Sequence, residues 1–397
     1  MPHHAASRCG IGRDAPATQV KPISLAIVRQ RYAADGGAER FVARTLEALK
    51  GRDVRLTLIA RDWQEVPGIE TITLDPFYIG RVWRDCSFAR AVQAYAARGR
   101  FDLVQSHERI PGCSVYRAGD GVHAEWLAQR AATLPGWRRL SQALNPYHVY
   151  MKRTERRLFT HPQLRAVICN SEMVKREIAT RFGVRDDVLH VVYNGVDLNE
   201  YHPDLHGHRA HVRATFGIPE SAPLFVFVGS GFERKGVATL LRALVGVPSA
   251  YLLVVGRDKK SQTYAAQAHR LGLARRVTFV GSVSDVKPYY GAADALVLPT
   301  LYDPFPNVVL EAMASGLPVA ISEKCGAIDI VENGRNGFVC AATDVAAFAA
   351  ALRALADPSR AKEMGAAARA TVSSFRMEWT AEQLAALYAR LMNRTDA

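Results

Sequence analysis

The sequence predicts an α/β protein built from two domains, each with a mostly parallel sheet. Short apolar, β-branched strands alternate with helical segments along nearly the whole chain, which is the pattern of a parallel sheet covered by helices. The chain has 397 residues, too many for one ordinary hydrophobic core. The alternation breaks after Asp197 and starts again with a strand at Leu224. We therefore expect one domain at 21–197 and a second at 198–375.

The first half carries a glycine pair at a strand-to-helix turn. Its expected strands lie at 23–29, 54–59, 101–105, 164–169 and 188–192. Its expected helices lie at 39–50, 85–97 and 171–181. Gly36 and Gly37 follow the first strand, at the edge where an α/β sheet binds ligands. The full Gly-x-Gly-x-x-Gly pattern is absent, so a dinucleotide site is not expected. The two glycines can also serve the turn alone.

The second half repeats the alternation and ends in a separate helix. Its expected strands lie at 224–228, 251–255, 277–280, 295–298 and 319–321. Its expected helices lie at 237–244, 307–314, 345–355, 361–373 and 377–392. The last helix is amphipathic and is expected to form a C-terminal element over 376–397. At the other end, residues 1–20 lack an apolar region, so they are expected to be a disordered leader rather than a secretory signal.

Composition indicates a globular protein without a metal site. Hydrophobic residues make up 49% and charged residues 22% of the chain, and no charge-free stretch approaches the roughly 20 apolar residues that span a bilayer. The six cysteines are scattered, with no metal-ligand spacing, which is typical of reduced thiols in the cytoplasm. The histidines after Asp197 have no acidic residues near them at a spacing that would complete a metal site. We therefore expect no metal and no cofactor.

The charge is uneven. The formal net charge is +13; residues 1–197 hold 30 Lys and Arg against 20 Asp and Glu, and residues 198–397 hold 21 against 18. A basic first half suits an anionic partner: a nucleic acid, a membrane face or an acidic substrate. The basic residues can also simply decorate solvated helices. No zinc-finger, basic-zipper or RNA-recognition signature is present, so nucleic acid is not the expected partner.

One basic segment, 137–159, suits a membrane surface. Lys152, Arg153, Arg156 and Arg157 share a broad helix face, and aromatic residues flank them. Such a face can rest on anionic lipid. An ordinary exposed helix explains it equally well at this point.

The stretch from Pro299 to Ala320 offers two acids beside a helix start. Asp303 is expected in a loop and Glu311 one turn into the helix, with Asn307 as its N-cap. The first amides, from Val308 and Val309 to Leu310, lack intrahelical partners and favour an anion such as phosphate. Carboxylates suit sugar hydroxyls. Alternatively, the first acid only caps a turn and the second is solvated.

A second anion site is expected in the sequence GSGFERKG at 229–236. Glycines such as Gly229 let the backbone approach a ligand closely. Arg234 and Lys235 stand beside the start of the next helix. Two fixed cations near a helix N-terminus can stabilise the negative charge that develops on a departing diphosphate.

Polar residues of the first half gather at expected strand ends. His107 follows the strand at 101–105, and Asp120 and His123 lie in a glycine-containing loop soon after. Catalytic groups are often found in such loops. Asp120 is the preferred general base, or hydroxyl-orienting acid, for an acceptor. Each of the three can instead be a structural hydrogen-bonding residue.

Four motifs, in this order, resemble the retaining glycosyltransferases of family 4. They are GGAER at 36–40, NGVD at 194–197, RKG at 234–236, and the two-acid stretch that ends LEAMASGLPV at 310–319. The resemblance covers nearly the whole chain after the leader and implies the GT-B fold, two Rossmann-like domains facing across a cleft with the last helix returning to the first domain. GSGFERKG and DGVHAEW at 120–126 look most like the lipopolysaccharide core glucosyltransferase branch.

The resemblance implies roles for the donor-site residues. Glu311 would hold the nucleotide ribose, and Arg234 and Lys235 would neutralise the diphosphate. Asp303 takes the place of the family's usual Glu, which contacts donor-sugar hydroxyls; because Asp is one methylene shorter, donor choice or activity can differ. The backbone at 307–309 would lie along sugar and phosphate.

It also implies roles in the first domain and an activity. Gly36 and Gly37 would close over the donor, and Asp120 matches a polar residue near the acceptor. The implied activity is retaining transfer of a hexose, expected to be glucose from UDP-glucose, to a lipopolysaccharide core or similar anionic, lipid-linked saccharide, at the inner membrane face. The alternatives are another lipid-linked or soluble acceptor, a catalytically silent nucleotide-sugar binder and, on pI alone, a nucleic-acid binder.

Overall fold

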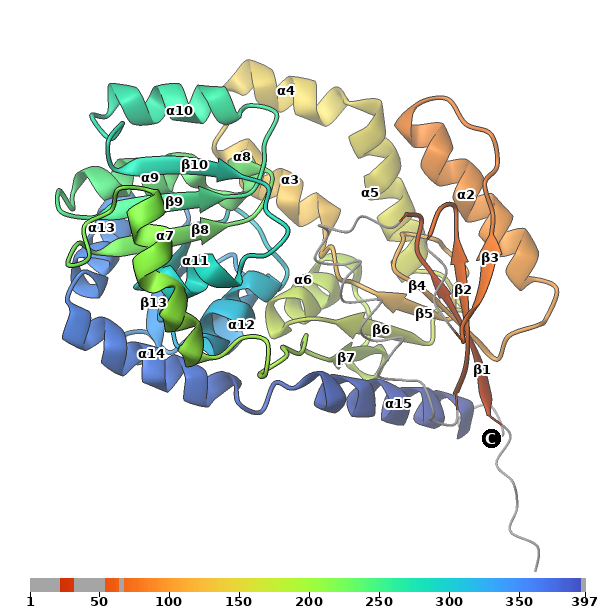
Figure 1. Cartoon of the computed structure of the whole chain (residues 1–397). Helices are drawn as coiled ribbons and strands as arrows, with labels where there is room; N and C mark the ends of the chain where they lie inside the picture. Colours follow the sequence, from red (N-terminus) through yellow and green to blue (C-terminus); the bar gives the residue numbers. More distant parts are fainter. Residues whose placement is uncertain (1–21, 32–53, 64–67, 394–397) are drawn as a thin grey trace, which may run out of the picture.

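The computed structural model describes residues 22–31, 54–63 and 68–393, and within them the chain forms two parallel sheets (Figure 1). The first has the order β3-β2-β1-β4-β5-β6-β7 and the second β10-β9-β8-β11-β12-β13, with every pairing parallel. Each order has a switch point where the strand sequence reverses, and ligands bind at the carboxyl side of such points. The predicted fold class is confirmed.

The first sheet uses short apolar strands covered by helices. Its strands are β1 Ile23–Val28, β2 Val54–Ala60, β3 Glu70–Thr73, β4 Leu103–Ser106, β5 Val115–Arg117, β6 Ala166–Cys169 and β7 Leu189–Val191. Its helices are α2 Gly80–Ala96, α3 His123–Ala132, α4 Gly136–Leu144, α5 Pro146–Phe159 and α6 Glu172–Phe182, with a short 3-10 turn, η1 Asp186–Val188. The predicted helix at 39–50 and the Gly36-Gly37 turn lie outside the described residues.

Helix α3 was not predicted, and its capping explains why. Its N-cap is Val122, which offers no capping side chain. Instead Glu155, on α5, accepts hydrogen bonds from the amides of His123 (2.5 Å) and Ala124 (3.1 Å). A cap supplied from 32 residues away leaves no local signal in the sequence. The prediction that His123 lies in a loop is therefore wrong, because it is the first residue of a helix.

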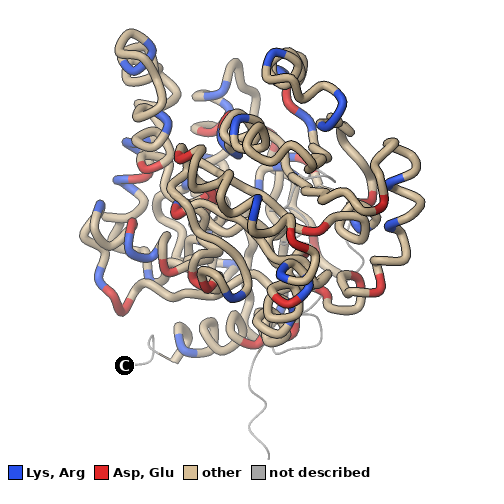
Figure 2. Tube along the Cα trace, turned by 90° about the vertical axis from the view of Figure 1, so that its left-hand side faces the viewer, with Lys and Arg blue, Asp and Glu red and all other residues tan. Residues whose placement is uncertain are grey.

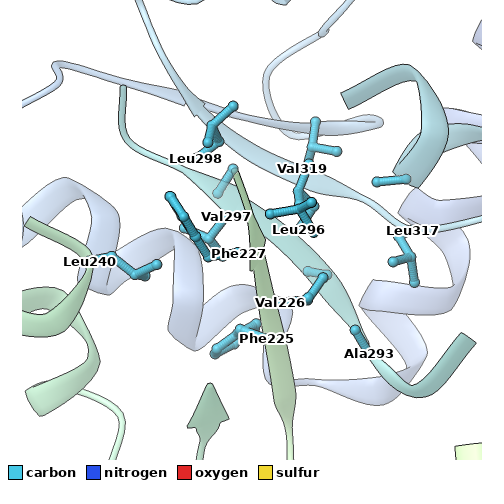
Figure 3. Close-up of a cluster of buried hydrophobic side chains, with 14 of the residues drawn as sticks. Phe225, Val226, Phe227, Leu240, Ala293, Leu296, Val297, Leu298, Leu317 and Val319 are labelled. Atoms are coloured by element: carbon cyan, nitrogen blue, oxygen red, sulfur yellow. The ribbon is translucent and has the colours of Figure 1, made fainter. Parts of the chain in front are cut away.

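The buried apolar cluster around the second sheet is larger than any of those around the first, and Figure 3 shows part of it. Its strands are β8 Leu224–Val228, β9 Tyr251–Val255, β10 Val277–Gly281, β11 Ala295–Leu298, β12 Val319–Ser322 and β13 Gly337–Cys340. The elements around it are η2 Pro203–His208, α7 Arg209–Thr215, α8 Phe232–Lys235, α9 Val237–Val245, α10 Ser261–Arg270, α11 Lys287–Ala292, α12 Asn307–Ala314, η3 Gly326–Asp329, α13 Val345–Leu355 and α14 Pro358–Val372. The continuous apolar strands, such as LFVFV of β8, are typical of sheets buried on both faces.

Helix α15, Met377–Asn393, returns from the second sheet to the first, along the lower edge in Figure 1. Leu384 and Leu387 pack with Leu25 and Ile27 of β1 in one buried cluster. The crossing lies beside the linker between the sheets, where the amide of Val196 donates to the carbonyl of Phe375 (2.8 Å). The two sheets are therefore tied by two adjacent segments. The domain limits at 197 and 375 stay predictions.

Some general features of the described residues bear on function. No helix among them is long and apolar enough to span a bilayer. Their five cysteines have free thiols. In the view of Figure 2, basic and acidic residues are interspersed over the molecule rather than forming one basic stripe.

Candidate functional site

A cavity of about 760 Å³ lies between the two sheets. Its lining comes from both domains, at the carboxyl ends of their strands: His107 follows β4, Asn170 follows β6, Gly229 follows β8 and Gly256 follows β9. Parallel strands present their carboxyl ends at one edge, which is where α/β sheets bind ligands. Asp120, Gly229, Arg234, Lys235, Asp303, Asn307, Val308 and Glu311, eight of the predicted site residues, line this one cavity.

Lys235 and Asp303 are paired to each other inside the cavity. The ammonium of Lys235 donates to Oδ2 of Asp303, and both side chains are buried. Arg234 Nη1 lies 4.0 Å from the same oxygen. Gly229 permits this packing, because its φ of +149° suits glycine and a Cβ there would meet Lys235 Cε at 3.3 Å. An ammonium has three donors, so Lys235 can hold Asp303 and an anion together.

The start of α12 differs in detail from the prediction. Pro306, not Asn307, occupies the N-cap position, because the side chain of Asn307 is used elsewhere: its Oδ1 accepts from Nδ2 of Asn194 (2.7 Å). The amide of Val309 donates to the carbonyl of Pro306 (3.1 Å), and Val309 is fully buried. The prediction that Val309 offers an open amide is therefore wrong, and Val309 is absent from the cavity lining; its contact with a substrate stays a prediction. Asn307 and Val308 do line the cavity.

Glu311 lies on the buried face of α12 and lines the cavity. Tyr290, on α11, donates its hydroxyl to Oε2 of Glu311 (2.9 Å), and both residues are buried. The tyrosine fixes the orientation of the carboxylate. A carboxylate held in this way can accept hydrogen bonds from a pair of sugar hydroxyls. The alternative that Glu311 is a solvated helix residue is wrong.

Asp120 faces these residues from the first domain. Its Oδ2 lies 3.5 Å from Arg29 Nη1, which is also 3.4 Å from Glu108. Desolvation inside the cavity, where the Asp120 side chain is still 49% exposed, favours its neutral carboxyl, but the guanidinium groups of Arg29, Arg109 and Arg234 outweigh this effect, so its pKa is lowered. A carboxylate with a lowered pKa is a weak base. The lowered pKa thus favours orientation of a hydroxyl by Asp120 over proton abstraction.

A hydrogen-bonded chain connects the first domain to α12. Arg117 Nη2, at the end of β5, donates to Oδ1 of Asn194 (2.7 Å), and Asn194 in turn donates to Asn307. Asn194 belongs to the NGVD motif. That motif was one of the four on which the family resemblance rested, but none of its residues was given a role. Arg117 had no signal in the sequence, because a buried arginine in a strand is recognised only by its distant partner. Both residues line the cavity.

The two histidines that the sequence singled out lie in different places. His107 lines it, and burial together with Arg117 and Arg29 holds the pKa of His107 well below its usual value. His123 is outside the cavity lining, and its ring contacts His148, with 3.1 Å between Nε2 and Nδ1. The structure therefore does not bring His123 to the predicted substrate site. Gly36 and Gly37 lie outside the described residues.

Comparison with known proteins identifies the family. Residues 35–200 match the family model described as Glycosyltransferase Family 4, and residues 209–371 match the model described as Glycosyl transferases group 1. The chain belongs to the family 4 glycosyltransferases. The two matches fall on the two sheets in turn, so this glycosyltransferase has both halves of the predicted GT-B architecture.

Three curated relatives differ in how much they share with this glycosyltransferase. An uncharacterized glycosyltransferase of Methanocaldococcus jannaschii, MJ1607, is 31% identical over 43% of this chain and 45% of its own length. The lipopolysaccharide core biosynthesis glycosyltransferase LpsE of Rhizobium meliloti is 26% identical over 83% of this chain and 88% of its own. The lipopolysaccharide glucosyltransferase WaaG of Escherichia coli is 26% identical over 80% and 85%.

Two solved structures show the same fold. The crystal structure of WaaG, a glycosyltransferase involved in lipopolysaccharide biosynthesis, has a TM-score of 0.79 at 23% identity, covering 91% of this chain and 99% of that one. Anabaena HepE in complex with UDP-glucose has a TM-score of 0.68 at 21% identity, covering 93% and 100%. At these identities the similarity supports the GT-B fold of this glycosyltransferase.

Proposed function

We propose that this glycosyltransferase moves a hexose, glucose from UDP-glucose, to a hydroxyl of a lipopolysaccharide core or similar lipid-linked saccharide, with retention of the anomeric configuration. The observation that carries the proposal is the shared cavity: Lys235 and Arg234 stand on one side of it with Glu311, and Asp120 stands across from them. Cations suit a diphosphate and fixed carboxylates suit sugar hydroxyls. Similarity to LpsE and WaaG supports the acceptor class.

The donor would be held by the second domain. The diphosphate meets Lys235 and Arg234, and the ribose meets the carboxylate of Glu311, which Tyr290 orients. A solved neighbour of the same fold, HepE, is described in complex with UDP-glucose, which supports this class of donor. Asp303, already neutralised by Lys235, can accept a hydrogen bond from the transferred sugar.

The transfer would take place on one face of the sugar. The bond from the anomeric carbon to the diphosphate oxygen breaks, the acceptor oxygen bonds to the same face, and the acceptor's proton passes to the departing diphosphate oxygen. Lys235 and Arg234 stabilise the charge that develops on the diphosphate. Asp303 is a poor covalent nucleophile because Lys235 holds it, and Asp120 would orient the acceptor hydroxyl.

The acceptor would approach from a membrane surface along the first domain. Helix α4, at the top of Figure 1, exposes Trp137, Leu140 and Leu144, at 68%, 62% and 69%. Their spacing of three and four residues places them on one face. The next helix, α5, exposes the predicted basic residues Lys152, Arg153, Arg156 and Arg157. Apolar side chains beside cations favour the surface of an anionic leaflet, at the cytoplasmic side.

The deciding experiment measures donor and acceptor separately. Binding of UDP, ADP and GDP sugars is ranked by thermal shift, since a ligand at a hundred times its Kd stabilises by about 2.7 kcal/mol. UDP-glucose is expected to give the largest shift. Transfer is then assayed with UDP-glucose and lipopolysaccharide truncated before its first glucose, and the anomeric configuration of the product is determined by NMR. Absence of both binding and transfer contradicts the proposal.

The two alternative functions give different results in the same assays. A catalytically silent binder shows the thermal shift but neither transfer nor hydrolysis of UDP-glucose. An enzyme for another acceptor hydrolyses UDP-glucose slowly and transfers to capsular or soluble saccharides but not to the truncated lipopolysaccharide. Salt dependence distinguishes the acceptor site from the donor site. Added ionic strength should weaken the binding of an anionic acceptor to the basic first domain more than it weakens the binding of UDP.

A further inference from the structure

A tyrosine of the second domain has its ring buried in the first domain. Tyr302 lies in the loop between β11 and α12, yet its ring belongs to a buried cluster of first-domain residues that includes Tyr116, Ala118 and Val122. It is 1% exposed. A large side chain that leaves its own domain's core and is fully buried in another marks a specific docking contact.

The hydroxyl of Tyr302 is satisfied on both sides by the first domain. It accepts from the amide of Val122 (2.8 Å) and donates to Oε2 of Glu177 (2.7 Å). Burial and the neighbouring Glu177 carboxylate raise the pKa of Tyr302, so the hydroxyl keeps the proton that it donates. A buried hydroxyl with a matched donor and acceptor is specific, because removing it leaves both partners unpaired.

The first domain is shaped to receive this ring. Gly121, next to Asp120, has a φ of +64°, which favours glycine, and a Cβ there would lie 2.4 Å from the Tyr302 oxygen and 2.6 Å from Cγ of Pro304. The glycine therefore meets two requirements: a left-handed turn and space for a side chain of the other domain. The Gly-Asp-Gly sequence is thus both a cavity wall, through Asp120, and a docking surface.

Further polar contacts join the same two domains. The hydroxyl of Ser171 donates to the carbonyl of Pro304 (2.8 Å). Lys324 of the second domain lies between two first-domain carboxylates, 3.2 Å from Glu125 and 3.5 Å from Glu177. These buried and half-buried pairs fix the register of one domain on the other.

Tyr302 also touches the donor side through its main chain. Its carbonyl accepts from Arg234 Nη1 (3.3 Å), and the next residue, Asp303, holds Lys235. The Tyr302 side chain thus binds the first domain, while its main chain lies against Arg234 and precedes Asp303, the partner of Lys235. A shift of the domains at this contact is transmitted directly to the position of Arg234 and Asp303 relative to Asp120.

We propose that Tyr302 is a positioning residue that couples docking of the two domains to the geometry of the transfer site. It rests on the proposed function in one respect, that the reaction needs groups of both domains around one substrate. Binding of a diphosphate uses the second domain and does not need the contact. Transfer of the sugar does need the Tyr302 contact, because Asp120 of the first domain must face the donor.

The kinetic test is Tyr302→Phe, which keeps the ring and removes the hydroxyl. The kcat for transfer from UDP-glucose is expected to fall about tenfold or more, since an unpaired buried group costs about that factor, while the Kd for UDP measured by calorimetry changes less than twofold. Glu177→Gln, which keeps an acceptor oxygen for the hydroxyl, is expected to stay closer to wild type than Glu177→Ala. An unchanged kcat in Tyr302→Phe overturns the proposal.

A matched control separates positioning from stability. Tyr388 on α15 is another buried tyrosine, and its hydroxyl donates to Oε1 of Gln105 (2.8 Å) away from this contact. Tyr388→Phe should lower the Tm without lowering kcat. If both tyrosine variants lose the same kcat, Tyr302 is merely structural and the proposal is wrong.

A substrate-free measurement distinguishes failure of this proposal from failure of the proposed function. Small-angle scattering of Tyr302→Phe is expected to show a larger radius of gyration than wild type or Tyr388→Phe, because the domains separate at the loosened contact. That result supports the coupling even if UDP-glucose proves not to be the donor. An unchanged radius of gyration in Tyr302→Phe overturns the coupling while leaving the donor assignment intact.

Discussion

Lys235 neutralises Asp303 in the lining of the interdomain cavity, although the two residues are 68 positions apart. Each was expected to act on a different part of the donor, the lysine on the diphosphate and the aspartate on the sugar. Their pairing means that neither charge is buried alone, which would be costly. It also means that the substrate must share the lysine with the aspartate, so changes at the two positions should have linked effects.

Removing the lysine tests the charge on the leaving group. Lys235→Ala is expected to lower kcat for transfer by roughly 10²-fold or more, as when other preorganised charge stabilisers are lost. Initial rates under saturating UDP-glucose measure this. Arg242→Ala, an exposed arginine on α9, is the control and should keep wild-type turnover. A Lys235→Ala enzyme with full kcat contradicts the assigned role.

Removing the aspartate's charge should separate binding from transfer. In Asp303→Asn the lysine has lost its anionic partner, so UDP is expected to bind more tightly while transfer falls, because the contact to the sugar is weakened. The fold should also lose stability, by about 3 kcal/mol or more for a broken buried pair. Calorimetry with UDP and chemical unfolding measure the two effects. Asp303→Glu, which keeps the charge, is the control; weaker UDP binding in Asp303→Asn argues against competition for the lysine.

The tyrosine that orients Glu311 should affect donor binding. Tyr290→Phe removes the hydrogen bond to Oε2 of Glu311, and the loss of a bond to a buried charged group is worth about 1.5–3 kcal/mol. The KM for UDP-glucose is expected to rise about tenfold with a smaller change in kcat. Tyr264→Phe, in the same domain but outside the cavity lining, is the control. If KM is unchanged, the carboxylate does not hold the donor.

The exposed apolar face of α4 should bind membranes. Replacing Trp137, Leu140 and Leu144 by Ser removes apolar area without touching the cavity. Cosedimentation with vesicles containing anionic phosphatidylglycerol is expected to fall severalfold, while UDP binding stays unchanged. A second variant, with Lys152, Arg153, Arg156 and Arg157 changed to Gln, should lose binding mainly at low salt. Equal cosedimentation of all three proteins would mean that this face does not meet lipid.

The sequence predicted the fold well because strand and helix signals are local. The strand at 295–298 and the helices at 307–314 and 345–355 have the expected limits, and Ser171 caps α6 as predicted through a bond from Val174. Each of these depends on residues within a few positions. Helix α3 was missed because its capping carboxylate, Glu155, comes from another helix.

Within the site, the residue types could be predicted but their pairings could not. Glu311 and Lys235 were expected beside an anionic ligand and do line one cavity. The contact of Lys235 with Asp303, the tyrosine that holds Glu311, and the insertion of Tyr302 beside Val122 all depend on docking of separate segments. Docking leaves no periodicity in a sequence. Asn194, whose amide connects both domains, was visible only as part of a motif.

Stability should fall in mild acid because the fold keeps certain histidines neutral. Partial burial, with Arg109, His148 and Lys152 nearby, lowers the pKa of His123 to about 3. Below the ordinary value near 6.5, the unfolded chain therefore binds a proton that the folded chain excludes. The contribution of neutral His123 to the free energy of unfolding is complete above about pH 6.5. It is lost as the pH falls towards 3, with a slope of up to about 1.4 kcal/mol per pH unit. Urea unfolding between pH 7 and pH 4 should show a shallower decline in His123→Asn than in wild type or in His269→Asn, a change on the surface helix α10. Because His107 also has a lowered pKa, some slope should persist; an unaltered slope in His123→Asn would show that this histidine is not kept neutral by the fold.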